Sequence, residues 1–267
     1  MLVNGKWVEN WQPVQKADEQ GRFVRQVSEF RNWITTDGRP GPTGEGGFEA
    51  EVGRYRLYVA LICPWASRTL IARRLKGLAD LIPVMVNNES ADIVRMFDTA
   101  FDAIAPSDLR LYPADLAEEI DVLNRQVYES LNNGVYKAGF ASSQEAYDEA
   151  VSGVFAMLDQ LETRLGDGRP YLCGDTLTET DIRAFVTLIR FDAAYHGLFK
   201  TNRRQIADYP HLSAHMERVL RLPGVAETVN MDHITRGYYS IKALNPTGIR
   251  PAGPAHVRRL LDVVAAD

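Results

Sequence analysis

A cysteine followed by proline is the feature that most limits what this chain can fold into. The run from Arg56 to Ile62 is rich in apolar and β-forming residues, and it ends at Cys63-Pro64. Apolar residues then recur at helical spacing from Leu70 to Leu78. Proline is favoured at the first helical position, where its missing N–H group would be unpaired anyway. The sequence therefore predicts a strand, a turn that carries Cys63, and a helix.

The start of a helix is a favourable place for a cysteine nucleophile. Unpaired N–H groups and the positive end of the helix dipole favour a thiolate over a thiol. A lone cysteine is more often a small buried hydrophobic residue, but the order strand, cysteine, proline and helix favours the nucleophile for Cys63. Gly77 follows three cations and provides a C-cap for the same helix.

The composition excludes several function classes. The chain has 267 residues, of which 45% are hydrophobic, and a net charge of −5. This charge gives no reason to expect nucleic acid or an anionic membrane as a partner. No apolar run reaches the length of about 18 residues that a membrane span needs, and the N-terminus lacks the apolar core of a signal peptide. We therefore expect a cytoplasmic protein with no membrane partner.

Neither the cysteines nor the histidines form a recognisable framework. Two cysteines are too few for a disulfide scaffold, and Cys173 is expected to be a packing residue. His211 and His215 are four residues apart on a predicted helix, but no third ligand accompanies them. We predict no metal site.

The pattern divides the chain into three parts. Residues 1–52 hold scattered aromatic residues and a glycine-rich stretch, which predicts an extension that packs on the core. Residues 53–103 hold the Cys63 unit, a second strand-like run at 81–86 and a helix from about Ser90. Residues 104–267 are predicted to be all-helical with an extended tail. The helical patterns cover 118–131, 144–165, 179–191 and 209–219, and the extended tail is predicted from Asn245 to Pro251.

The helix predicted from 179 begins with a capping box. In Thr178-Glu179-Thr180-Asp181, the threonine hydroxyl can accept from the N–H group near Asp181, and the Asp181 carboxylate can reach back to the N–H group of Thr178.

These features together resemble the glutathione transferase superfamily, which combines an α/β thioredoxin-like N-terminal domain with an all-α C-terminal domain. A narrower resemblance, to the glutathionyl-hydroquinone reductases or Xi-class glutathione transferases, which are omega-like and of the cysteine type, runs in order along nearly the whole chain. It is carried by Phe30-Arg31-Asn32-Trp33, Cys63-Pro64-Trp65-Ala66, Leu75-Lys76-Gly77-Leu78, Asn87-Asn88-Glu89-Ser90, Arg95-Met96-Phe97, the segment from Asn133 to Ala141, Arg190-Phe191-Asp192 with Tyr195, and His233-Ile234 with Tyr238-Tyr239.

The resemblance implies a reaction in which glutathione is the co-substrate. The Cys63 thiolate would attack the sulfur of a glutathionyl-hydroquinone, and a second glutathione would resolve the Cys63–glutathione mixed disulfide. Such an exchange needs one cysteine only. The resemblance also implies a homodimer.

Site residues follow from the same resemblance. Glu89 and Ser90 would bind the γ-glutamyl end of glutathione. Tyr195 and Tyr238 would be catalytic, with Trp65 and Tyr239 as further substrate contacts; the choice between the two adjacent tyrosines stays open. Taken without the resemblance, Asn-Glu-Ser is also typical of ordinary helix capping, and tyrosines on helices are more often half-buried packing residues.

The sequence departs from the family in two places. The family usually has histidine where this chain has Ser67. Its members are also some tens of residues longer, and we place the missing piece between Val86 and Asn87. Since a sheet without the strand encoded there would expose a long edge beside the active site, we expect the protein to retain that segment.

Two other functions are compatible with the same fold. One is a conjugating or dehalogenating glutathione transferase. The other is a non-catalytic binding protein, because a fold does not guarantee an activity.

Overall fold

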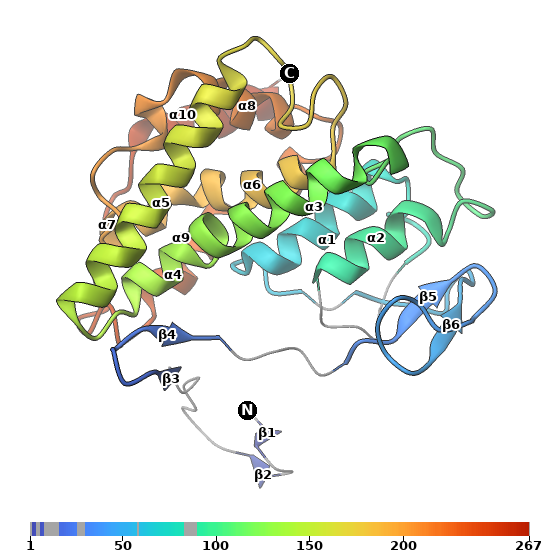
Figure 1. The fold of residues 1–267 in the computed structure, drawn as a ribbon, viewed down its shortest axis with the longest axis horizontal. Helices are drawn as coiled ribbons and strands as arrows, with labels where there is room; N and C mark the ends of the chain where they lie inside the picture. Colours follow the sequence, from blue (N-terminus) through green and yellow to red (C-terminus); the bar gives the residue numbers. More distant parts are fainter. Residues whose placement is uncertain are drawn as a thin grey trace.

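Helices are the main regular structure in the described part of the chain, and the strands are short and lie near the N-terminus (Figure 1). The computed structural model describes residues 2–3, 6–7, 16–25, 30–57, 59–82 and 90–266. Within these ranges, β1 (Leu2–Val3) pairs antiparallel with β2 (Lys6–Trp7), β3 (Lys16–Ala17) pairs antiparallel with β4 (Phe23–Val24), and β5 (Trp33–Thr35) pairs parallel with β6 (Gly47–Glu49).

The helices confirm the four helical patterns read from the sequence after residue 104. The predicted helices at 118–131 and 179–191 each end in a π-helical segment, η2 (Val127–Asn132) and η3 (Phe191–Tyr195). The α-helices are α1 (Pro64–Leu75), α2 (Ser90–Thr99), α3 (Ala117–Gln126), α4 (Gly134–Gly139), α5 (Gln144–Leu165), α6 (Glu179–Arg190), α7 (His196–Leu198), α8 (Pro210–Leu220), α9 (Met231–Tyr239) and α10 (Ala255–Ala266), and the 3₁₀ turns are η1 (Ala114–Leu116), η4 (Ile206–Asp208) and η5 (Ala226–Thr228).

The strand predicted from Arg56 to Ile62 is wrong. Arg56 forms an isolated bridge, and residues 59–62 are irregular or turn. A strand exists only where a neighbouring strand accepts its hydrogen bonds. The predicted partner at 81–86 is described only at Leu81 and Ile82, which end the turn after α1; its remainder, including Pro83, lies outside the described residues.

The N-terminal extension packs on α2, and it contains the parallel pair β5–β6, where no strand was predicted. Ile34 is 3% exposed, and its N–H group donates to the sulfur of Met96 at 3.0 Å. The Arg31 guanidinium pairs with the Asp92 carboxylate at 2.8 Å. These contacts join the extension to the core, while the bounds predicted for the three parts of the chain stay a prediction.

Helix α6 lies at the centre of the helical part, in contact with α1, α3 and α8 (Figure 1). All of its residues except Arg183 are buried. An isolated helix of this length would be marginal in water, so tertiary packing stabilises it.

The predicted capping box at the start of α6 is confirmed, and it is part of a larger buried cluster. The Asp181 carboxylate accepts from the N–H group and the hydroxyl of Thr178, at 2.8 and 3.0 Å. It also lies 2.7 Å from the N–H group of Leu172 and 2.9 Å from Nε2 of His215. Asp181 and His215 are both fully buried, so His215 belongs to the core.

The tail is extended and turn-rich from Asn245 to Pro251, as predicted, but the sequence analysis missed α10 after it. The side chain of His256 on α10 lies 2.8 Å from the carboxylate of Asp192 in η3. This long-range contact holds the start of α10. The sequence near His256 carries no local pattern that predicts the contact. None of the helices in the described part of the chain is long and apolar enough to cross a membrane.

Replacing the buried carboxylate tests how far the fold depends on it. We expect Asp181→Ala to lower the free energy of unfolding by about 3 to 5 kcal/mol, because four buried donors lose their charged acceptor. The measurement is urea unfolding followed by circular dichroism.

The matched control is Asp175→Ala, an exposed aspartate near the start of the same helix. It is expected to change stability by no more than about 0.5 kcal/mol. Equal effects of the two substitutions would contradict a special role for Asp181.

Candidate active site

Cys63 lies directly before the first residue of α1, as predicted. Its backbone is extended, with φ −72° and ψ 118°, and Pro64 occupies the first helical position. The Cys63 side chain is half-buried and makes no capping hydrogen bond, and the first N–H groups of a helix have no acceptor within the helix. This is the arrangement in which a helix N-terminus supports a sulfur nucleophile.

The other end of α1 is also formed as the sequence predicts. Gly77 has a φ of 66°, a conformation that favours glycine. Its N–H group donates to the carbonyl of Arg74 at 3.1 Å, and the N–H group of Leu78 donates to the carbonyl of Arg73 at 2.9 Å. This hydrogen-bond pair is the Schellman motif.

Arg190, near the end of α6, holds the loop that carries Cys63. Its guanidinium is 1% exposed and donates to the carbonyls of Leu61 and Ile62 at 3.3 and 3.2 Å. It also donates to the hydroxyl of Ser67 at 2.7 Å, and that hydroxyl donates to the Cys63 carbonyl at 3.1 Å. Ser67, where the family usually has histidine, therefore links Arg190 to the thiol-bearing residue.

Three tyrosine hydroxyls meet in a buried cluster. Tyr238 lies 2.7 Å from Tyr136 and 2.6 Å from Tyr195, and the Tyr136 and Tyr195 hydroxyls are 3.5 Å apart. Burial raises the pKa of Tyr136, and it raises the pKa values of Tyr195 and Tyr238 well above the ordinary value. All three hydroxyls therefore stay protonated at neutral pH and remain hydrogen-bond donors.

Tyr136 connects this cluster to Cys63. The charge of a Cys63 thiolate acts on Tyr136 and contributes to the rise in its pKa, after burial. The sequence analysis placed Tyr136 within a family-like segment but did not select it as a site residue. The signal that could have selected it is its position on α4, directly after the π-helical segment η2, because π-helical turns are frequent at functional sites.

The structure separates the two neighbouring tyrosines that the sequence left open. Tyr238 is 2% exposed and belongs to the cluster. Tyr239 is half-buried, with its hydroxyl beside Gly197 of α7. Of these two residues, Tyr238 is the one that the fold brings to Tyr136 and Tyr195.

Trp65 forms an aromatic wall on the first turn of α1. Its ring lies 6.2 Å from that of Tyr136 in a stacked arrangement and 6.0 Å from that of Tyr128. The Arg68 guanidinium lies 4.5 Å from the same ring. Trp65, two residues after Cys63, therefore packs on tyrosines of the helical part.

The residues predicted to bind glutathione are only partly described. Ser90 is the first residue of α2 and is 7% exposed, whereas Glu89 lies outside the described residues. The N-terminal position of Ser90 is as predicted.

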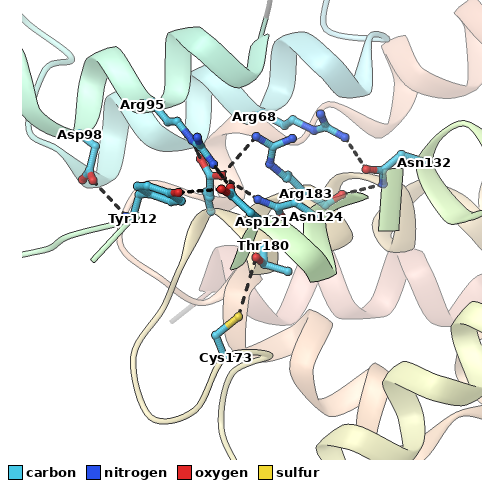
Figure 2. A network of polar contacts seen from close by, with 11 residues as sticks. Arg68, Arg95, Asp98, Tyr112, Asp121, Asn124, Asn132, Cys173, Thr180 and Arg183 are labelled. Carbon is cyan, nitrogen blue, oxygen red and sulfur yellow. Dashed lines mark hydrogen bonds and ion pairs between the residues drawn. The ribbon is translucent and has the colours of Figure 1, made fainter. Parts of the chain in front are cut away.

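A second polar cluster joins α2, α3 and α6 (Figure 2). The Glu179 carboxylate accepts from Arg95 at 2.8 Å and from Asn124 at 2.7 Å, and it pairs with Arg183 at 3.3 Å. Arg95 also pairs with Asp121 at 2.6 Å. The cluster fixes α2 against the helical part of the chain.

A cavity of about 620 Å³ lies beside this cluster. Trp33 and Thr43 of the extension line it together with Arg95 and Tyr128. Tyr128, which packs on Trp65, is part of the lining. Among the described residues, no cluster of three or more metal-ligating side chains occurs here or elsewhere.

Comparison with known proteins identifies the class and then the family. The family described as "Glutathione S-transferase, C-terminal domain" matches residues 144–218, which begin at α5 and end within α8. Together with the small α/β part and the cysteine at the start of α1, this match defines a glutathione transferase of the cysteine type.

Two curated relatives are similar over nearly their whole lengths. Glutathionyl-hydroquinone reductase YqjG of Escherichia coli (strain K12) is 44% identical, over 95% of this chain and 94% of that protein. Glutathionyl-hydroquinone reductase PcpF of Sphingobium chlorophenolicum is 39% identical, over 96% of each. The chain belongs to the glutathionyl-hydroquinone reductase family.

Solved structures agree with this assignment. The glutathione-bound structure of YqjG from Escherichia coli K-12 has a TM-score of 0.81 at 44% identity and covers 84% of this chain and 92% of that chain. The glutathione-S-transferase Xi of Phanerochaete chrysosporium has a TM-score of 0.83 at 38% identity and covers 91% and 96%. The thioredoxin-like and all-helical fold class predicted from the sequence is therefore confirmed.

The family's extra segment is absent from this chain. The YqjG alignment is 313 positions long and the chain has 267 residues, so at least 46 positions have no residue here. The chain runs without a break from Val86 to Asn87. That the protein retains the segment stays a prediction, and the position inferred for the deletion lies outside the described residues.

The two cysteines are expected to differ in reactivity. Cys173 is 3% exposed with its sulfur near the Thr180 hydroxyl (Figure 2), and burial raises the pKa of its thiol. At about pH 7.5, iodoacetamide should therefore modify Cys63 and spare Cys173 in the folded protein. Mass spectrometry measures the sites and rates.

The controls are Cys63→Ala, which should abolish labelling, and Cys173→Ala, which should leave it unchanged. Faster labelling of Cys173 than of Cys63 would contradict the assigned environments.

Proposed function

We propose that this protein is an enzyme that reduces glutathionyl-hydroquinones to hydroquinones with glutathione as the reductant. The observation that carries the proposal is a cysteine at a helix N-terminus beside three linked tyrosine hydroxyls. Two relatives at 44% and 39% identity are named for this activity. The glutathione in the solved YqjG structure supports glutathione as the co-substrate of this chain.

The reaction begins with attack of the Cys63 thiolate on the sulfur atom of the substrate. A sulfur–sulfur bond forms, and the bond between that sulfur and the ring carbon breaks. The electron pair goes to the ring carbon, which takes a proton and leaves as the hydroquinone. The thiolate of a second glutathione then attacks the mixed disulfide, which releases Cys63 and glutathione disulfide. Two glutathione sulfurs are oxidised while the ring carbon is reduced.

The tyrosine cluster serves the leaving hydroquinone. Negative charge develops on the ring and its oxygens as the carbon–sulfur bond breaks, and positioned donors stabilise such charge. The charge of a Cys63 thiolate acts on Tyr136, and the hydroxyls of Tyr195 and Tyr238 hold the Tyr136 hydroxyl in place. Trp65 packs against the aromatic ring of the substrate. Tyr239 lies outside the tyrosine cluster and does not donate to the leaving hydroquinone.

The γ-glutamyl end of glutathione binds at the start of α2 in this proposal. The Ser90 hydroxyl and the N–H groups of that turn receive its carboxylate, and Glu89 receives its ammonium group.

The cysteine favours this reaction over conjugation. A cysteine stabilises the thiolate of glutathione poorly but is a good nucleophile for exchange. We therefore rank a conjugating or dehalogenating glutathione transferase below the reductase. The features that favour a non-catalytic binding protein are Ser67, where the family usually has histidine, and the segment that this sequence lacks. A homodimer and a cytoplasmic location stay predictions from the resemblance and the composition.

Release of hydroquinone from glutathionyl-menadiol tests the proposal. With glutathione in excess, the parent protein should release free menadiol, and Cys63→Ala should lower the rate by about 1000-fold or more because it removes the nucleophile. Liquid chromatography measures the product. If the folded parent protein releases no menadiol, the reductase proposal fails and a non-catalytic binding protein becomes the favoured hypothesis.

Removal of one tyrosine hydroxyl tests the role of the cluster. Tyr136→Phe should lower kcat by about tenfold to 100-fold with little change in KM, because the donor acts on charge that develops in the transition state. Tyr128→Phe is the matched control, since Tyr128 contacts Trp65 but its hydroxyl lies outside the cluster. An unchanged kcat in Tyr136→Phe would remove this residue from the mechanism.

A further inference from the structure

One cation of the N-terminal extension lies at the thiol site, and the proposed mechanism does not use it. Arg25 directly follows β4, and its guanidinium lies 4.8 Å from the ring of Trp65, 4.8 Å from that of Tyr136 and 5.4 Å from that of Phe23. Trp65 is two residues from Cys63 along the chain, and the charge of a Cys63 thiolate acts on Tyr136. Arg25 therefore stands over the aromatic surface that receives the hydroquinone ring.

The hydrogen-bonding capacity of Arg25 is only partly used. Its Nε atom donates to the side-chain oxygen of Asn133 at 2.7 Å. Its Nη2 atom is buried and has no hydrogen-bond partner. A buried donor without an acceptor is destabilising, so the structure maintains this group at a cost in stability.

The charge of Arg25 is also without a carboxylate in the part of the chain that the structure describes. Arg22, three residues earlier on the same hairpin, shows the contrast: its Nε atom lies 2.8 Å from the carboxylate of Glu149. Stacking on rings compensates a cation only partly. An unpaired guanidinium nitrogen is suited to a carboxylate, to which it can donate a charge-assisted hydrogen bond.

We infer that Arg25 binds a carboxylate carried by the hydroquinone ring and so gives this enzyme a preference for acidic hydroquinones. The inference rests on the proposed function for its substrate class and adds a specificity determinant to it. The ring would lie against Trp65 and Tyr136, with its carboxylate at the Nη2 atom of Arg25. Glutathione carries carboxylates too, so the test separates the two sources.

Binding measurements test the inference without requiring turnover. The probes are 2,5-dihydroxybenzoate and uncharged 1,4-hydroquinone, and the readout is isothermal titration calorimetry. The parent protein should bind the carboxylated ring at least about tenfold more tightly. Arg25→Gln should abolish the preference, and Arg25→Lys should retain part of it because the charge remains.

Arg22→Gln is the matched control, since it removes a cation from the same hairpin outside the site. It should leave the preference unchanged. Thermal unfolding of each variant verifies that the extension still packs on the core. Equal affinity of the parent protein for both rings would overturn the inference, and so would an equal loss of affinity for both rings in Arg25→Gln, which would assign Arg25 a structural role.

Kinetics separate the source of the carboxylate. With the glutathione conjugate of 2,5-dihydroxybenzoate, Arg25→Gln should raise KM about tenfold with kcat maintained, and KM for the uncharged conjugate should not change. A rise in KM for glutathione in place of this pattern would assign the carboxylate to glutathione and overturn the inference. If the parent protein reduces neither conjugate, the proposed function fails, while the binding preference still decides the role of Arg25.

Discussion

The hydrogen bonds from Arg190 to the loop before α1 are the interaction on which the active site depends. They join a side chain of the central helix α6 to Leu61, Ile62 and Ser67, across more than 120 residues of sequence. Removing a guanidinium from water costs on the order of several kcal/mol unless its donors are satisfied. Here carbonyl and hydroxyl oxygens satisfy them, so the position of Cys63 is coupled to the folding of the helical domain.

Helix α6 positions several neighbouring elements through polar residues that are buried and hydrogen-bonded in the folded protein. Asp181 fixes its start and holds His215 of α8. Glu179 draws α2 and α3 to the same end through charged hydrogen bonds. Its far end continues into η3, which ends at Tyr195. One helix thus positions both the nucleophile loop and a hydroxyl of the tyrosine cluster.

The helical parts of the fold were predictable because their signals are local. Proline after Cys63, glycine at position 77 and the Thr178 cap each act within a few residues, and the structure forms all three as expected. The strand from Arg56 was not predictable in the same way, because a strand needs a distant partner. Helix α10 was missed for a related reason, since its start is held through Asp192.

The candidate site was predictable only where the chemistry lies in adjacent residues. Cys63 and Ser90 stand at helix starts, which a sequence pattern reveals. Tyr136 and Arg25 were missed because their significance arises from neighbours far along the chain: the hydroxyl of Tyr238 in one case, and the ring of Trp65 in the other.

The sequence by itself determined α1, α2, α3, α5, α6 and α8, the cysteine at the start of α1 and, through resemblance, the family. Backbone hydrogen bonds and capping interactions act over about four residues, so local order is sufficient for them. Only the tertiary structure decided which tyrosines share hydrogen bonds, what supports the Cys63 loop and where the charge of Arg25 lies. These are contacts between side chains brought together by burial, and burial follows from the packing of the whole chain.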